Sequence, residues 1–111
     1  MQNQRSWINN VKIEEDIPGQ GVPLRRGDRA SIRLEIRLNG GDLVEVIDRY
    51  SLTIGKRQTI AAVEYALEGM CVGGRRKIKA SPHLCYGSSG VAGKIPANAV
   101  LRLTIDLLSL A

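Results

Sequence analysis

The sequence predicts an α+β domain with five or six antiparallel strands and one short helix packed on a face of the sheet. Two segments, 31–38 and 101–107, alternate apolar and polar residues without a break, as strands with one buried and one solvated face do. Segment 59–68 instead has apolar residues at helical spacing. One short helix on a twisted sheet gives two layers around a single core, which is the α+β arrangement.

The composition is that of one globular domain. The chain has 111 residues, of which 43% are hydrophobic and 24% charged, and its net charge is +5. Aromatic residues make up only 4% and include no Phe, so we expect a core of Ile, Leu, Val and Ala. No apolar run reaches the roughly 20 residues of a membrane span, and residues 1–10 lack the apolar stretch of a signal peptide. We therefore expect an N-terminal arm over 1–10, one domain over 11–111 and a cytoplasmic location.

The N-terminal half predicts four strands. Residues 11–13 alternate and give a short strand, and 31–38 gives the first long one. The segment 39–41 is Asn-Gly-Gly, and these residues tolerate the positive φ of a tight hairpin. The next strand, 43–47, therefore returns antiparallel to the first, and 51–54 gives a further short strand.

The segment 59–68 predicts the one helix. Ile60, Val63 and Leu67 fall at positions i, i+3 and i+7, which lie on one face of a helix. Gly69 follows, where glycine is preferred after the last helical turn. Two glutamates are expected on the solvent side of this helix: Glu64 and Glu68.

The alternation also predicts which side chains form the core. Four residues of the first long strand face inward: Ile32, Leu34, Ile36 and Leu38. Four residues of the last strand do the same: Leu101, Leu103, Ile105 and Leu107. The apolar face of the helix is expected to pack on these two rows.

The positive charge is concentrated in the second half of the chain. Residues 56–111 hold eight basic and three acidic side chains and therefore carry the whole excess. A strand predicted over 75–80 places Arg75, Lys77 and Lys79 on one face, which suits a nucleic acid, an acidic partner or a solvated outer sheet face. Because no aromatic residues for base stacking are interleaved, we expect the solvated face and no nucleic acid partner.

The thiols and the histidine predict neither a disulfide framework nor a metal site. Cys71 and Cys85 are too few for such a framework, and in a reducing compartment we expect two unpaired, mostly buried thiols. His83 is the only histidine, and with Cys85 two residues away it falls short of the four ligands of a zinc site. We expect no metal and no cofactor.

The predicted connection over 81–98 is unusually long. Its eighteen irregular residues exceed the ordinary length of a connection, so this loop is a functional candidate. Residues 87–94 have a partial likeness to a phosphate-binding loop, but Ile95 replaces the required hydroxyl residue and Pro96 disfavours a following helix. We therefore exclude phosphate-loop chemistry.

Six segments keep the order and spacing of one known family. They are Arg26-Gly27-Asp28, Leu38-Asn39-Gly40-Gly41, Leu52-Thr53-Ile54-Gly55 leading to Ile60, Gly69-Met70-Cys71-Val72-Gly73-Gly74-Arg75-Arg76, Ser81-Pro82-His83-Leu84-Cys85-Tyr86-Gly87 and Ile95-Pro96-Ala97-Asn98-Ala99-Val100-Leu101. Together they resemble the FKBP-type peptidyl-prolyl isomerases, the immunophilins that bind rapamycin, over about residues 11–110. The resemblance implies an antiparallel sheet of five to six strands curled around one short helix, in agreement with the elements predicted above.

The resemblance also implies an activity, the rotation of X-Pro peptide bonds in proline-containing peptides or protein clients. This rotation breaks amide resonance and has a barrier of ~18–20 kcal/mol. The twisted amide is less dipolar than the planar one, so an apolar pocket that excludes water favours it without nucleophile, metal or cofactor. A rapamycin-type ligand is a further implied partner, with weak affinity. A non-catalytic protein-interaction domain on the same fold is the alternative.

The family's pocket lies between the helix and the concave face of the sheet, and the resemblance transfers six binding residues to this chain. Three positions match: Tyr86 is the loop tyrosine whose hydroxyl holds a ligand carbonyl, Ile60 is the residue whose backbone N–H does so, and Ile95 is a wall isoleucine. Three positions are replaced: Tyr50 stands for a phenylalanine, Thr59 for a valine and Glu45 for an aspartate.

Four pocket-lining positions have lost the family's aromatic rings. Leu34 stands where the family has a tyrosine, Val44 and Leu103 where it has phenylalanines, and Val63 where it has the tryptophan of the floor. An aromatic side chain buries about 150–250 Å². The pocket is therefore either wider and shallower or collapsed, and we expect weakened catalysis.

Several of the transferred residues have equally simple structural explanations. Ile60 and Ile95 are as well explained as plain core residues. Core packing alone explains Val63, Leu34 and Leu103. Tyr86 is as well explained as an anchor of its own turn, through its hydroxyl. Glu45 is equally suited to pair with Arg33 or Arg37 on the neighbouring strand, at little energetic gain if the pair is exposed.

Overall fold

The structure is a computed structural model that describes residues 7–8 and 11–111. Six strands form one sheet in the order β1-β2-β5-β6-β3-β4, and each neighbouring pair is antiparallel. The strands are β1 (Trp7–Ile8), β2 (Val11–Ile17), β3 (Arg29–Leu38), β4 (Leu43–Thr53), β5 (Arg75–Ala80) and β6 (Leu101–Leu110). The helical elements are α1 (Ala61–Leu67) and the single 3₁₀ turn η2 (Pro82–Leu84). The predicted α+β class, with an antiparallel sheet and one short α-helix, is confirmed for the described residues.

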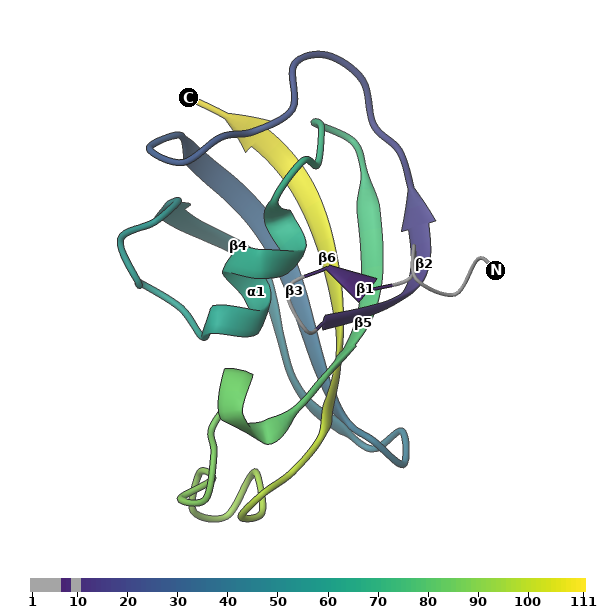
Figure 1. Cartoon of the computed structure of the whole chain (residues 1–111), viewed down its shortest axis with the longest axis vertical. Helices are drawn as coiled ribbons and strands as arrows, with labels where there is room; N and C mark the ends of the chain where they lie inside the picture. Colours follow the sequence, from purple (N-terminus) through teal and green to yellow (C-terminus); the bar gives the residue numbers. More distant parts are fainter. Residues whose placement is uncertain (1–6, 9–10) are drawn as a thin grey trace.

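The helix α1 lies against the curved sheet, where it contacts β6, β2 and β5 (Figure 1). The turn η2 and the loop that follows it lie at the end of the sheet nearest the start of α1 (Figure 1). Of the predicted N-terminal arm, Trp7–Ile8 forms β1 beside β2, and the other residues of 1–10 lie outside the described residues. No helix in the described part of the chain is long and apolar enough to span a membrane.

The predicted core is confirmed, with two exceptions at its rim. The inward rows of β3 and β6 are buried at Ile32, Leu34, Ile36, Leu101, Leu103, Ile105 and Leu107. On α1, Val63 and Leu67 are fully buried against them. Leu38 and Ile60 are only half-buried, because they lie at the last residue of β3 and just before α1.

One continuous strand, β4, replaces the two strands predicted over 43–47 and 51–54. Ile32 of β3 pairs with Tyr50, and Leu34 pairs with Ile47, so two residues of β4 lie opposite one residue of β3. This is a β-bulge. The extra residue interrupts the alternation of inward and outward side chains that identifies a strand in the sequence. The one strand β4 therefore has the sequence pattern of two separate strands.

A buried arginine joins the end of α1 to the sheet. Arg76 of β5 is 8% exposed, and its Nη1 donates to the carbonyl oxygens of Ala66 and Glu68, each at 2.7 Å. Its Nε donates to the carboxylate of Asp16 on β2 at 3.2 Å. The last turn of a helix leaves carbonyl groups without partners inside the helix, and here a cation from the core face of the sheet satisfies two of them.

Candidate functional site

The loop 54–60, which leads into α1, is fixed by side chains on both sides. The hydroxyl of Tyr50 on β4 donates to the carbonyl oxygen of Gln58. The side-chain oxygen of Gln58 in turn accepts from the backbone N–H of Thr53 at 2.7 Å. Tyr50 is one of the predicted substrate contacts, and its hydroxyl is already engaged in holding this loop against the end of β4.

A glutamate of α1 holds the other side of this loop. The Oε2 atom of Glu64 accepts from the backbone N–H groups of Gly55 at 3.1 Å and Arg57 at 3.3 Å. Glu64 was expected on the solvent side of the helix, but it is half-buried because it turns toward the loop. The backbone on both sides of Gln58 is therefore fixed, and with it the entry into the helix.

This arrangement presents the backbone N–H of Ile60 at the start of α1. Ile60 has an extended backbone, with φ −64° and ψ 150°, and its carbonyl accepts from Val63 N–H at 3.1 Å. Its own N–H donates to no other residue of the described chain. Thr59, the residue before it, is half-buried. The donor that the family resemblance assigns to a ligand carbonyl is therefore free of a protein acceptor within the described part.

The second assigned donor, the Tyr86 hydroxyl, also lacks a protein partner among the described residues. The turn around Tyr86 is held by backbone bonds instead, from the N–H of Gly87 to Pro82 O at 2.8 Å and from that of Gly90 to Tyr86 O at 3.0 Å. The hydroxyl is therefore not needed as an anchor of its turn. Burial, and secondarily the negative charge of nearby Glu45, raises the pKa of Tyr86, which keeps the hydroxyl a protonated donor at neutral pH.

Glu45 is exposed, but it lies on the core-side face of β4 because it pairs with Ile36 of β3, and it contacts the long loop. Its carboxylate is 3.9 Å from Nζ of Lys94. The alternative partners proposed from the sequence, Arg33 and Arg37, contact Glu35 instead, at 3.8 Å and 2.7 Å. Arg33, Glu35 and Arg37 contact one another because residues two positions apart in a strand lie on the same face, here the outward face of β3.

Ile95 belongs to the core side of the long loop. It is 7% exposed, and its backbone exchanges two hydrogen bonds of 2.8 Å with Val91, from Ile95 N–H to Val91 O and from Val91 N–H to Ile95 O. This bridge shapes the loop tip beside Lys94. Glu45 and Tyr50 act electrostatically on Tyr86 and so lie near it, and Ile95 follows Lys94, which contacts Glu45. Thr59 and Ile60 adjoin at the helix start, and the substrate-binding role of all six residues stays a prediction.

The floor beneath these residues is closed. Val63 is 0% exposed, Leu34 is 3% exposed and Leu103 is 1% exposed, all within one continuous core. Val44 is half-buried and packs on the same core. Val63, Leu34 and Leu103 are therefore closed to solvent, and whether the pocket is wider and shallower or collapsed stays a prediction. The pocket-lining role of these four residues stays a prediction.

The thiols and the histidine contribute no reactive centre here. Cys71 and Cys85 are both free, as predicted, and both are half-buried. Burial raises the pKa of the Cys85 thiol to about 11, so it is un-ionised and a poor nucleophile at neutral pH. His83 is exposed, and no cluster of potential metal ligands occurs within residues 7–8 and 11–111.

The basic residues of β5 lie on the outer face of the sheet. Arg75 donates to Asp106 of β6 at 2.6 Å, and Lys77 lies 3.5 Å from Glu15 of β2. Lys79 is the third member of this row. Two of the three charges are paired across neighbouring strands, which favours the solvated sheet face over an electrostatic binding surface.

Sequence reasoning missed the residues that shape the site without touching it. Gln58 and Glu64 hold the loop before α1, and Lys94 joins the long loop to β4. Acidic Glu64 near the helix start was visible in the sequence as a helix-stabilising residue. Its contact with the loop amides depends on how the loop folds back, and no local pattern predicts that.

Comparison with known proteins agrees with this geometry. Residues 21–108 match the family model of the FKBP-type peptidyl-prolyl cis-trans isomerases. FK506-binding protein 1A of Neurospora crassa is 33% identical over 108 residues, which cover 93% of this chain and 90% of that protein.

Two longer proteins are similar over part of their length. FK506-binding protein 4 of Chaetomium thermophilum is 35% identical over 106 residues, 93% of this chain but 22% of that protein. Peptidyl-prolyl cis-trans isomerase FKBP9 of Mus musculus is 44% identical over 97 residues, 84% of this chain and 17% of that protein. The chain thus spans about a fifth of these two relatives and most of the shorter one. The family match over most of the chain, together with the observed fold, shows that this chain belongs to the FKBP-type peptidyl-prolyl cis-trans isomerase family.

Proposed function

We propose that this domain binds proline-containing segments of peptides or folding clients and catalyses cis–trans isomerisation of the X-Pro bond, more slowly than relatives with an aromatic-lined pocket. The observation that carries the proposal is the pair of donors above an apolar floor. The N–H of Ile60 and the hydroxyl of Tyr86 have no acceptor within the described chain. The positions that the resemblance assigns to the pocket lining, Val63, Leu34 and Leu103, are aliphatic and buried in the core.

The chemistry needs only orientation and the exclusion of water. A substrate with carbonyls on either side of the proline meets one donor from the helix start and one from the long loop. These two hydrogen bonds fix the ends of the segment while the X-Pro amide rotates above the aliphatic surface. Because the twisted amide is less dipolar than the planar one, an apolar surface stabilises it relative to the ground state. No proton is transferred and no covalent intermediate forms.

The aliphatic floor explains why the rate is reduced. Because Val63 is fully buried, a proline ring gains none of the contact surface that a tryptophan at this position would offer it. Its carbonyl is therefore less completely removed from water. A rapamycin-type macrocycle depends more heavily on aromatic walls than a single proline does, so we propose that such ligands bind weakly.

The closed floor also favours a second candidate function, a non-catalytic interaction domain. In that case the two donors hold a proline-containing segment of a partner protein without accelerating its rotation. Binding and catalysis are separable by experiment, because binding requires the donors while catalysis also requires the apolar surface to discriminate between planar and twisted amides.

Exchange NMR on a short Ala-Pro peptide tests the proposal directly. We expect cross-peaks between cis and trans resonances that appear on adding the protein, with kcat/KM below that of an aromatic-lined FKBP domain under the same conditions. Tyr86→Phe removes one hydroxyl donor and should lower kcat/KM about three- to tenfold, as the loss of one hydrogen bond does. Thr104→Val, which removes a hydroxyl from the outer side of β6, should leave it unchanged.

Three outcomes separate the candidates. Peptide binding with exchange at the spontaneous rate assigns the non-catalytic function. Exchange as fast as in the aromatic-lined relative overturns the argument from the aliphatic floor, and absence of binding overturns both functions.

As a further part of this proposal, the two unpaired thiols support a reducing compartment such as the cytoplasm.

A further inference from the structure

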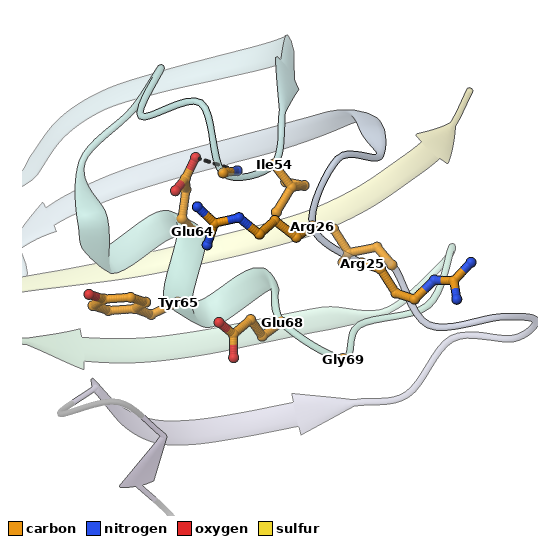
Figure 2. Close-up of a pocket in the computed structure, with 9 residues that line it drawn as sticks. Arg25, Arg26, Ile54, Glu64, Tyr65, Glu68 and Gly69 are labelled. Carbon is orange, nitrogen blue, oxygen red and sulfur yellow. Dashed lines mark hydrogen bonds between the residues drawn. The ribbon is translucent and has the colours of Figure 1, made fainter.

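Two adjoining cavities run beside α1 and together form a surface that we call the helix-side groove. The cavity nearer the start of α1 has a volume of about 350 Å³ and is lined by Arg57, Thr59, Ala61, Glu64 and Tyr65. The other has a volume of about 380 Å³ and lies between α1 and the segments 24–26 and 54–55 (Figure 2). The cavities adjoin because both are lined by Glu64 and Tyr65.

The groove has an apolar base and a rim that carries both arginines and glutamates. Leu24 and Ile54 form the base, and they are 3% and 6% exposed. Arg26 and Arg57 lie on the rim, one in each cavity. Arg25 also borders the groove, but its guanidinium points away from it (Figure 2).

Arg26 packs against Gly55 at the edge of the groove. Its side chain lies across Gly55, where an added Cβ would be 2.8 Å from Arg26 Cγ. Gly55 has φ +94°, so glycine suits both the backbone and the close approach of the arginine. Figure 2 shows the guanidinium of Arg26 reaching toward α1 beside Glu64.

The two arginines of the rim are not ion-paired within the described chain. Neither Arg26 nor Arg57 forms an ion pair with any described residue. Glu64 and Glu68 also line the groove, and Oε2 of Glu64 already accepts two backbone N–H groups. The groove therefore offers two guanidinium groups to an incoming anion, and a guanidinium is well matched to a carboxylate.

The groove begins beside the prolyl site. Thr59 lines it, and the next residue, Ile60, carries the backbone donor of the proposed function. A peptide held at Ile60 can therefore continue along α1 without leaving the surface. The seven residues of α1 span about 10 Å, which an extended peptide covers in about three or four residues.

We propose that the helix-side groove is an extended subsite that selects proline-containing clients with an acidic side chain three or four residues from the proline. The acidic side chain lies between Arg26 and Arg57, and the peptide backbone follows the outward side of α1. The inference rests on the proposed function, because it takes the prolyl site as the point from which the peptide extends. It adds a sequence preference that the two free donors alone do not provide.

Fluorescence anisotropy with labelled peptides tests the subsite. Each peptide contains one Ala-Pro step and carries Glu, Gln or Lys either three or four residues before the proline or three or four residues after it. We expect the Glu peptide to bind about three- to tenfold more tightly than its Gln counterpart for one of these placements, and the Lys peptide to bind more weakly than either. The preference for Glu should shrink as the salt concentration rises.

Paired variants locate the effect. Arg26→Gln combined with Arg57→Gln should bring the ratio of Glu to Gln affinities close to one. Arg102→Gln makes the same type of charge change on the outward face of β6 and should leave that ratio as in the unmodified protein. Circular dichroism and urea unfolding of each variant confirm that the comparison is between folded proteins.

The outcomes distinguish this inference from the proposed function. Equal binding of Glu, Gln and Lys peptides at every placement overturns the subsite and leaves the prolyl site standing. Binding of none of the peptides overturns both. A short single-stranded DNA that binds through Arg26 and Arg57 more tightly than the best Glu peptide also overturns the peptide subsite, and assigns the groove to a polyanion instead.

Discussion

The two ends of α1 are built in opposite ways. At the C-terminal end of α1, the carbonyl groups of Ala66 and Glu68 accept hydrogen bonds from the buried guanidinium of Arg76. At its start, no side chain caps the helix, and the backbone N–H of Ile60 has no acceptor among the described residues. One end is fastened to the sheet, and the other leaves a donor available to a ligand.

The difference shows how a helix of seven residues serves both stability and binding. A helix this short is not stable alone in water, so tertiary contacts must hold it in place. The buried face and Arg76 provide these contacts at the sheet. The loop before the helix is held by Glu64 and Gln58, which leaves the amide of Ile60 fixed in direction but unoccupied. Changes at the two ends should therefore separate stability from activity.

The largest effect on stability is expected at the C-terminal end of α1, where Arg76 bonds the helix to the sheet. Arg76→Met keeps the apolar stem but leaves two helix carbonyls without a donor, so the free energy of unfolding should fall by about 2–4 kcal/mol. Urea denaturation measures the loss. Arg75→Met removes the outward-facing neighbour, whose pair with Asp106 is partly exposed, and should cost less than about 1 kcal/mol. Equal losses in the two variants would show that the bonds to α1 do not stabilise the fold.

Val63, in the middle of α1, should respond to substitution as a residue of a fully packed core does. Val63→Trp restores the ring that the family places there, but Val63 is fully buried, so we expect overpacking at about 1–3 kcal/mol and no gain in X-Pro isomerisation. Thermal unfolding and exchange NMR on the same sample report both quantities. A gain in peptide affinity without loss of stability would reveal an open space beside Val63 and contradict the closed floor.

The open end should show the reverse pattern, with a loss of activity and little loss of stability. Ile60→Pro deletes the amide hydrogen, and the φ of −64° at this position already suits proline. We expect kcat/KM for a short proline peptide to fall about tenfold while stability changes by about 1 kcal/mol or less. Ile60→Val keeps the N–H and serves as the matched control. Undiminished activity in the proline variant would exclude this amide as a substrate contact.

The smallest effect concerns the thiol in the turn next to Tyr86. Burial raises the pKa of the Cys85 thiol to about 11 from its ordinary value of 9.0, so above pH 9 the unfolded chain releases a proton that the folded protein retains. Stability should therefore fall as pH rises from 9 toward 11, by no more than about 1 kcal/mol at pH 10 for a half-exposed group. Cys85→Ala should show a smaller fall between pH 8 and 10. An identical fall in both proteins would exclude Cys85 as its source.

Much of the fold could be predicted because its strands have local patterns. In β3 and in residues 101–107 of β6 each inward residue is apolar and each outward residue is polar, so the period of two identified both strands and their buried faces. The bulge in β4 could not be read this way, since it changes the period within one strand. Arg76 was also missed, although it shares the inward face of β5 with Ile78 and Ala80. Its burial depends on acceptors from α1 and β2, which are distant in sequence.

The sequence could indicate candidate site residues only at positions that match the family. The resemblance identified Tyr86 and Ile60, and the structure presents both donors without protein partners in its described part. The resemblance did not indicate that the hydroxyl of Tyr50 is engaged by Gln58, or that Lys94 lies next to Glu45. These contacts are set by the paths of two irregular loops, and small differences in backbone path decide which side chains meet.

The bulge in β4 has a consequence for how the domain behaves in a crowded solution. β4 is the last strand of the sheet, so one side of its backbone has no neighbouring strand and could template pairing with another chain. The bulge opposite Arg33 twists that edge and interrupts its even row of donors and acceptors. A second molecule can therefore match only part of the strand at a time. The β-bulge that made β4 resemble two strands in the sequence therefore also protects the domain from aggregation along this edge.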